Sequence, residues 1–191
     1  MLAVSTQVAI GNRILAALPA EQFARLQQHL SMVSLERDKV LYITGAEIRY
    51  VYFPTSGLVS LLSTTETGST VEAAMVGNEG IIGLPVILKN KMIPFEVTVQ
   101  TKTDAYRIKA EDLQEEFDRG EALHELILRY LNVLIAEISQ AALCHRFHTV
   151  EEALGRWLLL AQDRLHADSL NLTQEIISHA LGVPRTGVTM A

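Results

Sequence analysis

The chain has 191 residues, 49% of them apolar and 20% charged, and its formal net charge at pH 7 is −6. This composition is that of a globular protein long enough for one domain and a smaller second one, and it excludes a disordered or fibrous chain. The negative net charge excludes a surface that binds nucleic acid over its whole extent, because phosphate contacts need local positive charge.

The sequence predicts a cytoplasmic protein without membrane contact. It has no uncharged apolar run of about 18 residues, the length that reads as a membrane-spanning helix, and residues 1–10 lack the basic start of a signal peptide. The single cysteine, Cys144, cannot form a disulfide within the chain and fits a reducing compartment.

Two short helices are expected near the N-terminus, between Asn12 and Leu30. Their apolar residues recur at helical spacing, and Pro19 divides them. Between Met32 and Ile108 the pattern changes to short β-rich runs separated by turn residues. Many short strands at this spacing are typical of a jelly roll or barrel.

A long helix is predicted from about Glu121 to about His145, after a short one at residues 110–117. Its apolar positions are separated by steps of three and four residues, which places them on one face over about six turns. These positions are Leu123, Ile127, Tyr130 or Leu131, Leu134, Ile138, and Ala141 or Ala142.

The remaining sequence predicts three shorter helices. Thr149 is a good N-cap for a helix that ends near Leu165. Thr173 can cap the next helix, Gly182 suits the left-handed residue that ends it, and the last helix would begin near Pro184. Two helices joined by a glycine turn are the arrangement of a DNA-binding helix-turn-helix, although any pair of short packed helices shows the same spacing.

Three segments of the sequence resemble the Crp/Fnr family of transcription regulators, the relatives of the cyclic AMP receptor protein. They are residues 51–60 (VYFPTSGLVS), 76–85 (VGNEGIIGLP) and 150–159 (VEEALGRWLL). The expected order of helical cover, barrel, long helix and helix-turn-helix agrees with this family, so the resemblance covers nearly the whole chain.

The resemblance implies an α+β fold: N-terminal helices, an antiparallel β jelly roll like that of cyclic nucleotide-binding domains, a long dimerisation helix and an incomplete winged helix-turn-helix. The implied domains are an effector-sensing barrel with its helical cover at 1–120, the dimerisation helix at 121–148 and a partial DNA-binding domain at 149–191. The expected dimer interface consists of Leu123, Ile127, Tyr130, Leu131, Leu134, Ile138 and Ala141.

The implied function is regulation of transcription by a homodimer whose full-length form binds a palindromic DNA operator, with RNA polymerase as a further partner. Arg185 stands where such regulators have a recognition-helix arginine, whose guanidinium reaches O6 and N7 of guanine together. Thr173, Thr186 and Thr189 are expected to add phosphate or base contacts. An effector of unknown identity would bind in the barrel. Its candidate lining residues, each of which also fits plain core, are Leu61, Met75, Ile82, Gly83, Leu84 and Val99.

The sequence departs from the family members that bind cyclic AMP. Those members carry a glycine–glutamate pair and an arginine on the cyclic phosphate. Gly83 matches the glycine, but Leu84 replaces the glutamate, and no arginine lies between Arg49 and Arg107. Glu96 would repel the phosphate. Only point charges remain, on Lys89, Lys91 and Lys102. We therefore expect the barrel not to bind cyclic AMP.

No cofactor, metal ligand or catalytic residue is predicted. One cysteine cannot hold an iron–sulfur cluster, and Cys144, His145 and His148 fall short of the four ligands of a structural zinc. The strand region 32–108 has no histidine for a cupin-like metal enzyme, and no nucleophile elbow or phosphate loop is present. The chain is therefore expected not to be an enzyme.

The last expectation concerns DNA affinity. Fewer than two turns follow Pro184 in the sequence, and such a short helix is marginal. We expect this polypeptide, truncated within the helix-turn-helix, to bind DNA weakly or not at all. The alternative function is a small-ligand sensing module that does not bind DNA in this truncated form.

Overall fold

The computed structural model describes residues 10–167, 169–170 and 172–190, except for the side chains of Arg185 and Met190. The prediction about a signal peptide concerns residues 1–10, nearly all of which lie outside the described residues. The structure identifies seven strands and seven α-helices within the described ranges.

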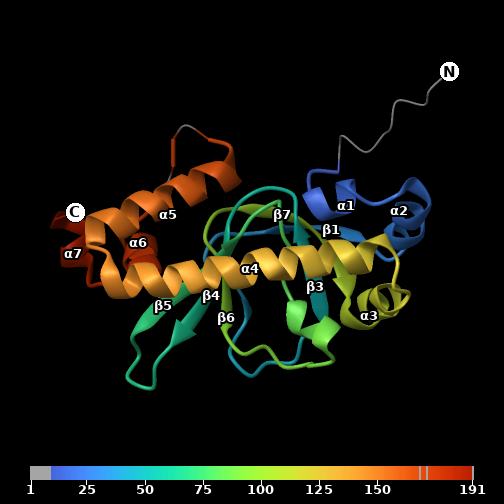
Figure 1. The fold of residues 1–191 in the computed structure, drawn as a ribbon, viewed down its shortest axis with the longest axis horizontal. Helices are drawn as coiled ribbons and strands as arrows, with labels where there is room; N and C mark the ends of the chain where they lie inside the picture. The colour runs from blue at the N-terminus through green and yellow to red at the C-terminus, as the bar shows by residue number, and fades with distance from the viewer. Residues whose placement is uncertain (1–9, 168, 171, 191) are drawn as a thin grey trace.

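Two antiparallel sheets form the barrel (Figure 1). One sheet has the strand order β1-β7-β3 and the other the order β2-β6-β4-β5. Strand β3 shows the alternation of a strand with one face on a core: Val51 and Phe53 are fully buried, and Tyr50 and Tyr52 are partly exposed. The strands are β1 (Ser31–Leu35), β2 (Val40–Tyr42), β3 (Tyr50–Pro54), β4 (Val59–Thr64), β5 (Thr70–Val76), β6 (Glu96–Val99) and β7 (Thr103–Lys109).

The N-terminal helices α1 (Arg13–Ala16) and α2 (Ala20–Gln27) cover one end of the barrel. Asn12 attaches them, because its side-chain oxygen caps α1 while its amide nitrogen donates to the carbonyl oxygens of Pro54 at 2.8 Å and Gly80 at 2.9 Å. Asn12 is fully buried, so each of these bonds replaces one to water.

Five helices and a 3₁₀ turn complete the fold. The turn η2 (Leu84–Leu88) follows β5, and α3 (Ala110–Asp118) follows β7. Helix α4 (Ala122–Phe147) runs along one side of the barrel, and α5 (Val150–Leu165) folds back beside it (Figure 1). Thr149 and Glu152 form a capping box at the start of α5. The last helices are α6 (Gln174–Leu181) and α7 (Arg185–Met190).

The buried side chains form two clusters. The larger one fills the barrel and includes the inward faces of α1, α3 and α4. The smaller one lies where α5 and α6 meet the barrel, and consists of Leu58, Met75, Trp157, Ala161, Ile176, Ala180 and Leu181. The predicted α+β order of helical cover, antiparallel jelly roll and long helix is confirmed.

Candidate functional sites

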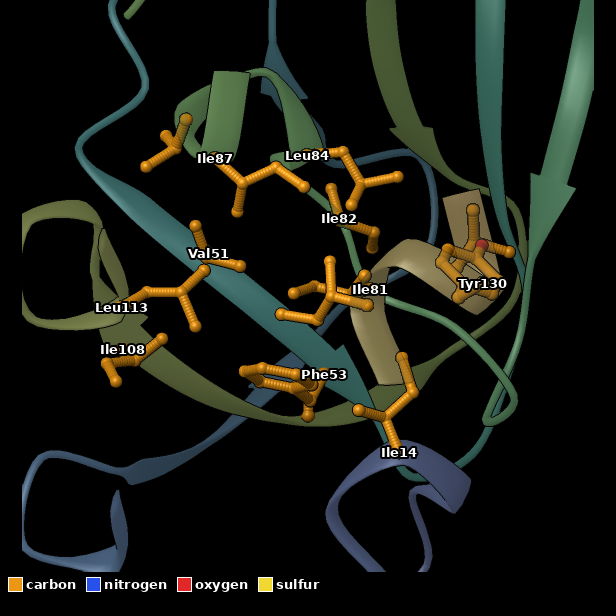
Figure 2. Packing of buried hydrophobic residues seen from close by; sticks show 14 of the residues in the cluster. Ile14, Val51, Phe53, Ile81, Ile82, Leu84, Ile87, Ile108, Leu113 and Tyr130 are labelled. Carbon is orange, nitrogen blue, oxygen red and sulfur yellow. The ribbon is translucent and has the colours of Figure 1, made fainter. Parts of the chain in front are cut away.

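The interior of the barrel is filled with apolar side chains (Figure 2). Val51 and Phe53 of β3 lie beside Ile81 and Ile82, and Tyr130 of α4 lies at one side. None of the five has more than 8% of its surface exposed. Burial raises the pKa of the Tyr130 hydroxyl. These side chains offer no charge to an anionic ligand.

Gly83 occupies a backbone conformation that favours glycine. Its φ is 103°, and a Cβ atom there would lie 3.1 Å from Cγ2 of Val51. Leu84 follows at the start of η2 and is 7% exposed. The position that carries glutamate in the nucleotide-binding relatives is therefore part of the apolar core.

The six predicted effector-pocket residues do not form one cluster. Leu61, Ile82, Leu84 and Val99 belong to the barrel core, whereas Met75 packs in the smaller cluster with Trp157. The structure thus places these side chains in two separate packed regions, and a pocket lined by all six stays a prediction.

The three lysines of this region lie on the surface. Lys89 pairs with Asp118 at 3.9 Å, and Lys102 pairs with Glu36 at 3.6 Å. Lys91 is also exposed. None of these side chains is buried in the barrel, where a cation would have to face a bound phosphate.

A groove with a volume of about 680 Å³ lies outside the barrel, between η2, β3 and α3. Ile48 and Val86 are the buried apolar residues of its lining. Three of its acidic residues come from α3, whereas its basic residues and Glu47 come from the other elements. The charged lining residues are Glu47, Arg49, Lys89, Lys91, Lys109, Glu111, Glu115 and Asp118.

Helix α4 has two apolar faces, and most residues of the predicted dimer interface lie on the face that packs against the barrel. Leu123, Ile127, Tyr130 and Leu134 are buried in the core of their own barrel. Leu131 and Ala141 are half-buried, and Ile138 is 37% exposed. Four of the seven predicted residues therefore pack within the chain, because the stripe read from the sequence is the one that covers the barrel.

A second apolar face of α4 is largely exposed. Leu128, Leu131, Ile135, Ile138 and Ala142 follow each other at steps of three, four, three and four residues. Leu128 is 42% exposed and Ile135 is 56% exposed. This spacing is that of the seam of a two-stranded coiled coil. We call these five residues the α4 seam.

Both apolar faces bear on the hydropathy of α4. By length and composition, α4 is the one helix within the described ranges that could cross a membrane. The face buried against the barrel and the α4 seam together account for this composition, since each is an apolar stripe on the same helix.

The C-terminal helices α6 and α7 follow each other across a short turn, which is the element order of a helix-turn-helix. The Thr173 hydroxyl accepts from the backbone N–H of Ile176 at 3.3 Å, and Gly182 ends α6 with a φ of 64°. The Gln174 amide donates to the Thr189 hydroxyl at 3.3 Å and so links α6 to α7. Thr186 is exposed. Arg185 begins α7, but its side chain lies outside the described residues, so its predicted guanine contact stays a prediction.

The barrel touches both ends of α6. Arg37 donates from Nη2 to the Thr173 hydroxyl at 3.3 Å, and a Cβ atom on Gly182 would lie 3.2 Å from Cγ2 of Val71 on β5. Thr173 was predicted as a DNA contact, and in this structure its hydroxyl is engaged by the barrel.

A polar junction that the sequence analysis missed joins the barrel to α5. Trp157 donates from its indole nitrogen to Oε1 of Glu72 at 2.7 Å, and the Ser60 hydroxyl donates to the other carboxyl oxygen. Arg164 donates to Glu79 at 2.8 Å and to Glu137 of α4 at 2.7 Å. The only sequence signal is that Trp157 and Arg164 are seven residues apart, hence on one face of α5.

Burial dominates the electrostatics of this junction. Glu72 is 6% exposed, and burial raises the pKa of its carboxyl group. Burial also raises the pKa of Glu137, although the Arg164 guanidinium opposes that shift. Within the described ranges, no group of three or more His, Cys, Asp or Glu side chains is placed to hold a metal ion.

Residues 32–119 match the family model of the cyclic nucleotide-binding domain. A comparison with curated proteins finds no match.

Several solved structures share the fold. The c-di-GMP responsive global regulator CLP of Xanthomonas campestris is 16% identical, with a TM-score of 0.75 over 90% of this chain and 89% of that one. FixK2 from Bradyrhizobium japonicum is 16% identical, with a TM-score of 0.74 over 84% and 81%. The N-terminal domain of a transcriptional regulator from Streptomyces coelicolor A3(2) is 25% identical, with a TM-score of 0.51 over 70% and 94%. The first and third are regulators by name, and none of the three is described as an enzyme.

Proposed function

We propose that the chain regulates transcription as a cytoplasmic homodimer that binds DNA, because residues 32–119 match the family model of the cyclic nucleotide-binding domain and the chain shares its fold with solved transcription regulators, one of them of the Crp/Fnr family. The proposal is carried by one observation: α4 bears an exposed coiled-coil seam, and a helix-turn-helix follows it later in the chain. The two features are complementary, because a symmetric dimer presents two reading heads to a symmetric site.

The proposed interface is the α4 seam rather than the stripe read from the sequence. Leu131 and Ile138 belong to both sets, so part of the predicted interface is kept. A parallel pair of α4 helices would bury Leu128 and Ile135, which are the most exposed large side chains of the α4 seam.

The proposed DNA-reading residues are Arg185 and Thr186 at the start of α7. An arginine there can bind guanine through two hydrogen bonds, and hydroxyl groups can bind phosphate. Thr173 and Thr189 remain proposed contacts. The Thr173 hydroxyl must first lose its hydrogen bond from Arg37. RNA polymerase is a further proposed partner, since the family regulates transcription.

The test of DNA binding is selection from a random DNA pool at low ionic strength, where phosphate contacts are strongest and the weak binding expected of this chain is most readily detected. We expect enriched sequences with two inverted half-sites about 34 Å apart, one helical turn. Arg185→Ala should remove the base preference. Arg49 is an exposed arginine on the barrel, so the control variant Arg49→Ala should keep that preference. A wild-type pool without enriched sequences would contradict the proposal.

The effector is proposed not to be cyclic AMP, because the interior of the barrel is apolar and its cations lie on the surface. CLP is described as responsive to c-di-GMP, so this dinucleotide belongs among the ligands to be tested here.

The second candidate function, small-ligand sensing without DNA, is favoured by one observation. The groove between η2, β3 and α3 has about 680 Å³ of space, which is within the usual range for small-molecule sites. If no DNA sequence were enriched in the selection and a ligand raised the melting temperature, this second function would be favoured.

A further inference from the structure

Helix α5 is attached to the barrel by donors on the helix and acceptors on the barrel. The Trp157 indole and the Arg164 guanidinium can only donate. They meet the carboxylates of Glu72, on β5, and Glu79, in the loop that follows β5. The attachment therefore depends on the ionisation state of the barrel's acidic groups.

The charges at this junction do not balance when every group has its usual ionisation. Glu72, Glu79 and Glu137 supply three negative charges, whereas Arg156 and Arg164 supply two positive ones. Buried charge without a partner is costly, so one further proton makes the junction neutral. Glu72 is the carboxyl group with the least exposure and with no cation as a hydrogen-bond partner.

A protonated Glu72 keeps all of the observed contacts. Its carbonyl oxygen accepts from the Trp157 indole, and its hydroxyl group shares a hydrogen bond with Ser60. We propose that Glu72 is a proton-operated latch: α5 stays docked on the barrel while the carboxyl group is protonated, and loss of that proton to solvent releases α5 with α6 and α7.

The direction of the pH dependence follows from burial. The pKa of Glu72 is raised above its usual value near 4.5 while α5 is docked, and it returns to that value when α5 leaves. Docking is therefore strongest at pH values below the usual pKa of Glu72. It weakens as the pH rises, until the pH exceeds the raised pKa of the docked state. In this window the docking equilibrium changes about tenfold per pH unit.

Other titratable and charged groups face Glu72 from the elements packed against it. From α4 these are Glu137, Cys144 and His145, and from α5 they are Arg156 and Arg164. A positive charge on His145 would favour the ionised form of Glu72, which is opposite to the proposed effect.

The latch concerns the junction alone and holds whether or not the C-terminal helices bind DNA. The direct test is backbone hydrogen exchange on the whole chain from pH 5 to pH 8.5, after correction for the intrinsic exchange rate. We expect opening of α5 and α6 to rise about tenfold per pH unit within the window, while β7 amides show no such rise. Trp157 is the only tryptophan, so its quenching by acrylamide should rise in parallel.

Three variants separate Glu72 from its neighbours. Glu72→Gln imitates the neutral acid and should keep α5 docked at every pH. Glu116→Gln changes an equally buried carboxyl group on α3 and should leave the pH dependence intact. His145→Gln should also leave it intact. Loss of the pH dependence in His145→Gln, or its persistence in Glu72→Gln, would overturn the proposal.

A fourth measurement keeps the test decisive if Glu72→Gln does not fold. Trp157→Phe removes the indole donor and should raise the opening of α5 at low pH, where the wild type is docked. Equal protection of α5 at all pH values in the wild type would overturn the latch without any variant.

Discussion

The α4 seam allows a matched pair of substitutions. Ile135 and Val133 lie two residues apart on nearly opposite sides of α4 and are 56% and 57% exposed. Only Ile135 belongs to the seam. Ile135→Glu should weaken the dimer, whereas Val133→Glu should not, because its side chain points away from the proposed partner.

The magnitude follows from the exposed surface. Full burial of an isoleucine side chain contributes about 1.5–3 kcal/mol, and about half of that remains available to a partner for Ile135. Two copies in a symmetric dimer therefore contribute about 2 kcal/mol, and the substitution removes this term. Because about 1.4 kcal/mol is a tenfold change, the dissociation constant should rise at least about 30-fold. Two facing carboxylates would raise it further.

The assay is sedimentation equilibrium over a range of protein concentrations, with circular dichroism to show that both variants are folded. The wild type and Val133→Glu should give the dimer mass, and Ile135→Glu should give the monomer mass at the same concentration. If Val133→Glu dissociated while Ile135→Glu remained dimeric, the seam would be assigned to the wrong face.

Four further outcomes are expected. Gly83→Ala should cost about 1–2 kcal/mol of unfolding free energy because Gly83 has a positive φ, and this loss should lower the melting temperature by roughly 2–8 °C. Gly155 lies in α5 with open space around it, so Gly155→Ala should raise the melting temperature instead. Phe53→Ala should cost about 3–5 kcal/mol in denaturant unfolding, and a cost below about 1 kcal/mol would contradict its role in the core. Arg164→Leu should cost about 3–5 kcal/mol of unfolding free energy, since it leaves two carboxylates unpaired. In urea titrations, a double variant that also carries Glu137→Gln should recover part of this loss. Saturating cyclic AMP should leave the melting temperature unchanged, and a clear rise would refute the argument from the missing arginine.

The sequence alone was sufficient for the order of the elements. Local signals carry this information: short β-rich runs between turns, a helical period over six turns, and Thr173 and Gly182 at the two ends of α6. The absence of an arginine between Arg49 and Arg107 also needed no structure, because a missing residue type stays missing in any fold.

Only the tertiary structure decided which face of α4 meets the barrel. The helical period identifies apolar stripes, but a helix with two such stripes is ambiguous until its neighbours are placed. Leu123 and Leu134 pack inward, and Leu128 and Ile135 remain exposed. The effector-pocket residues show the same limit, since Met75 and Val99 are both buried in strands but lie in different clusters.

The same reason explains why Glu72 was missed. In sequence it is one polar residue among apolar neighbours on a strand, the pattern of a side chain that faces solvent. Its burial is caused by Trp157, which lies 85 residues later and comes to cover it when α5 folds back onto the barrel. Local pattern determines which element forms, whereas burial and ionisation depend on contacts between elements far apart in the chain.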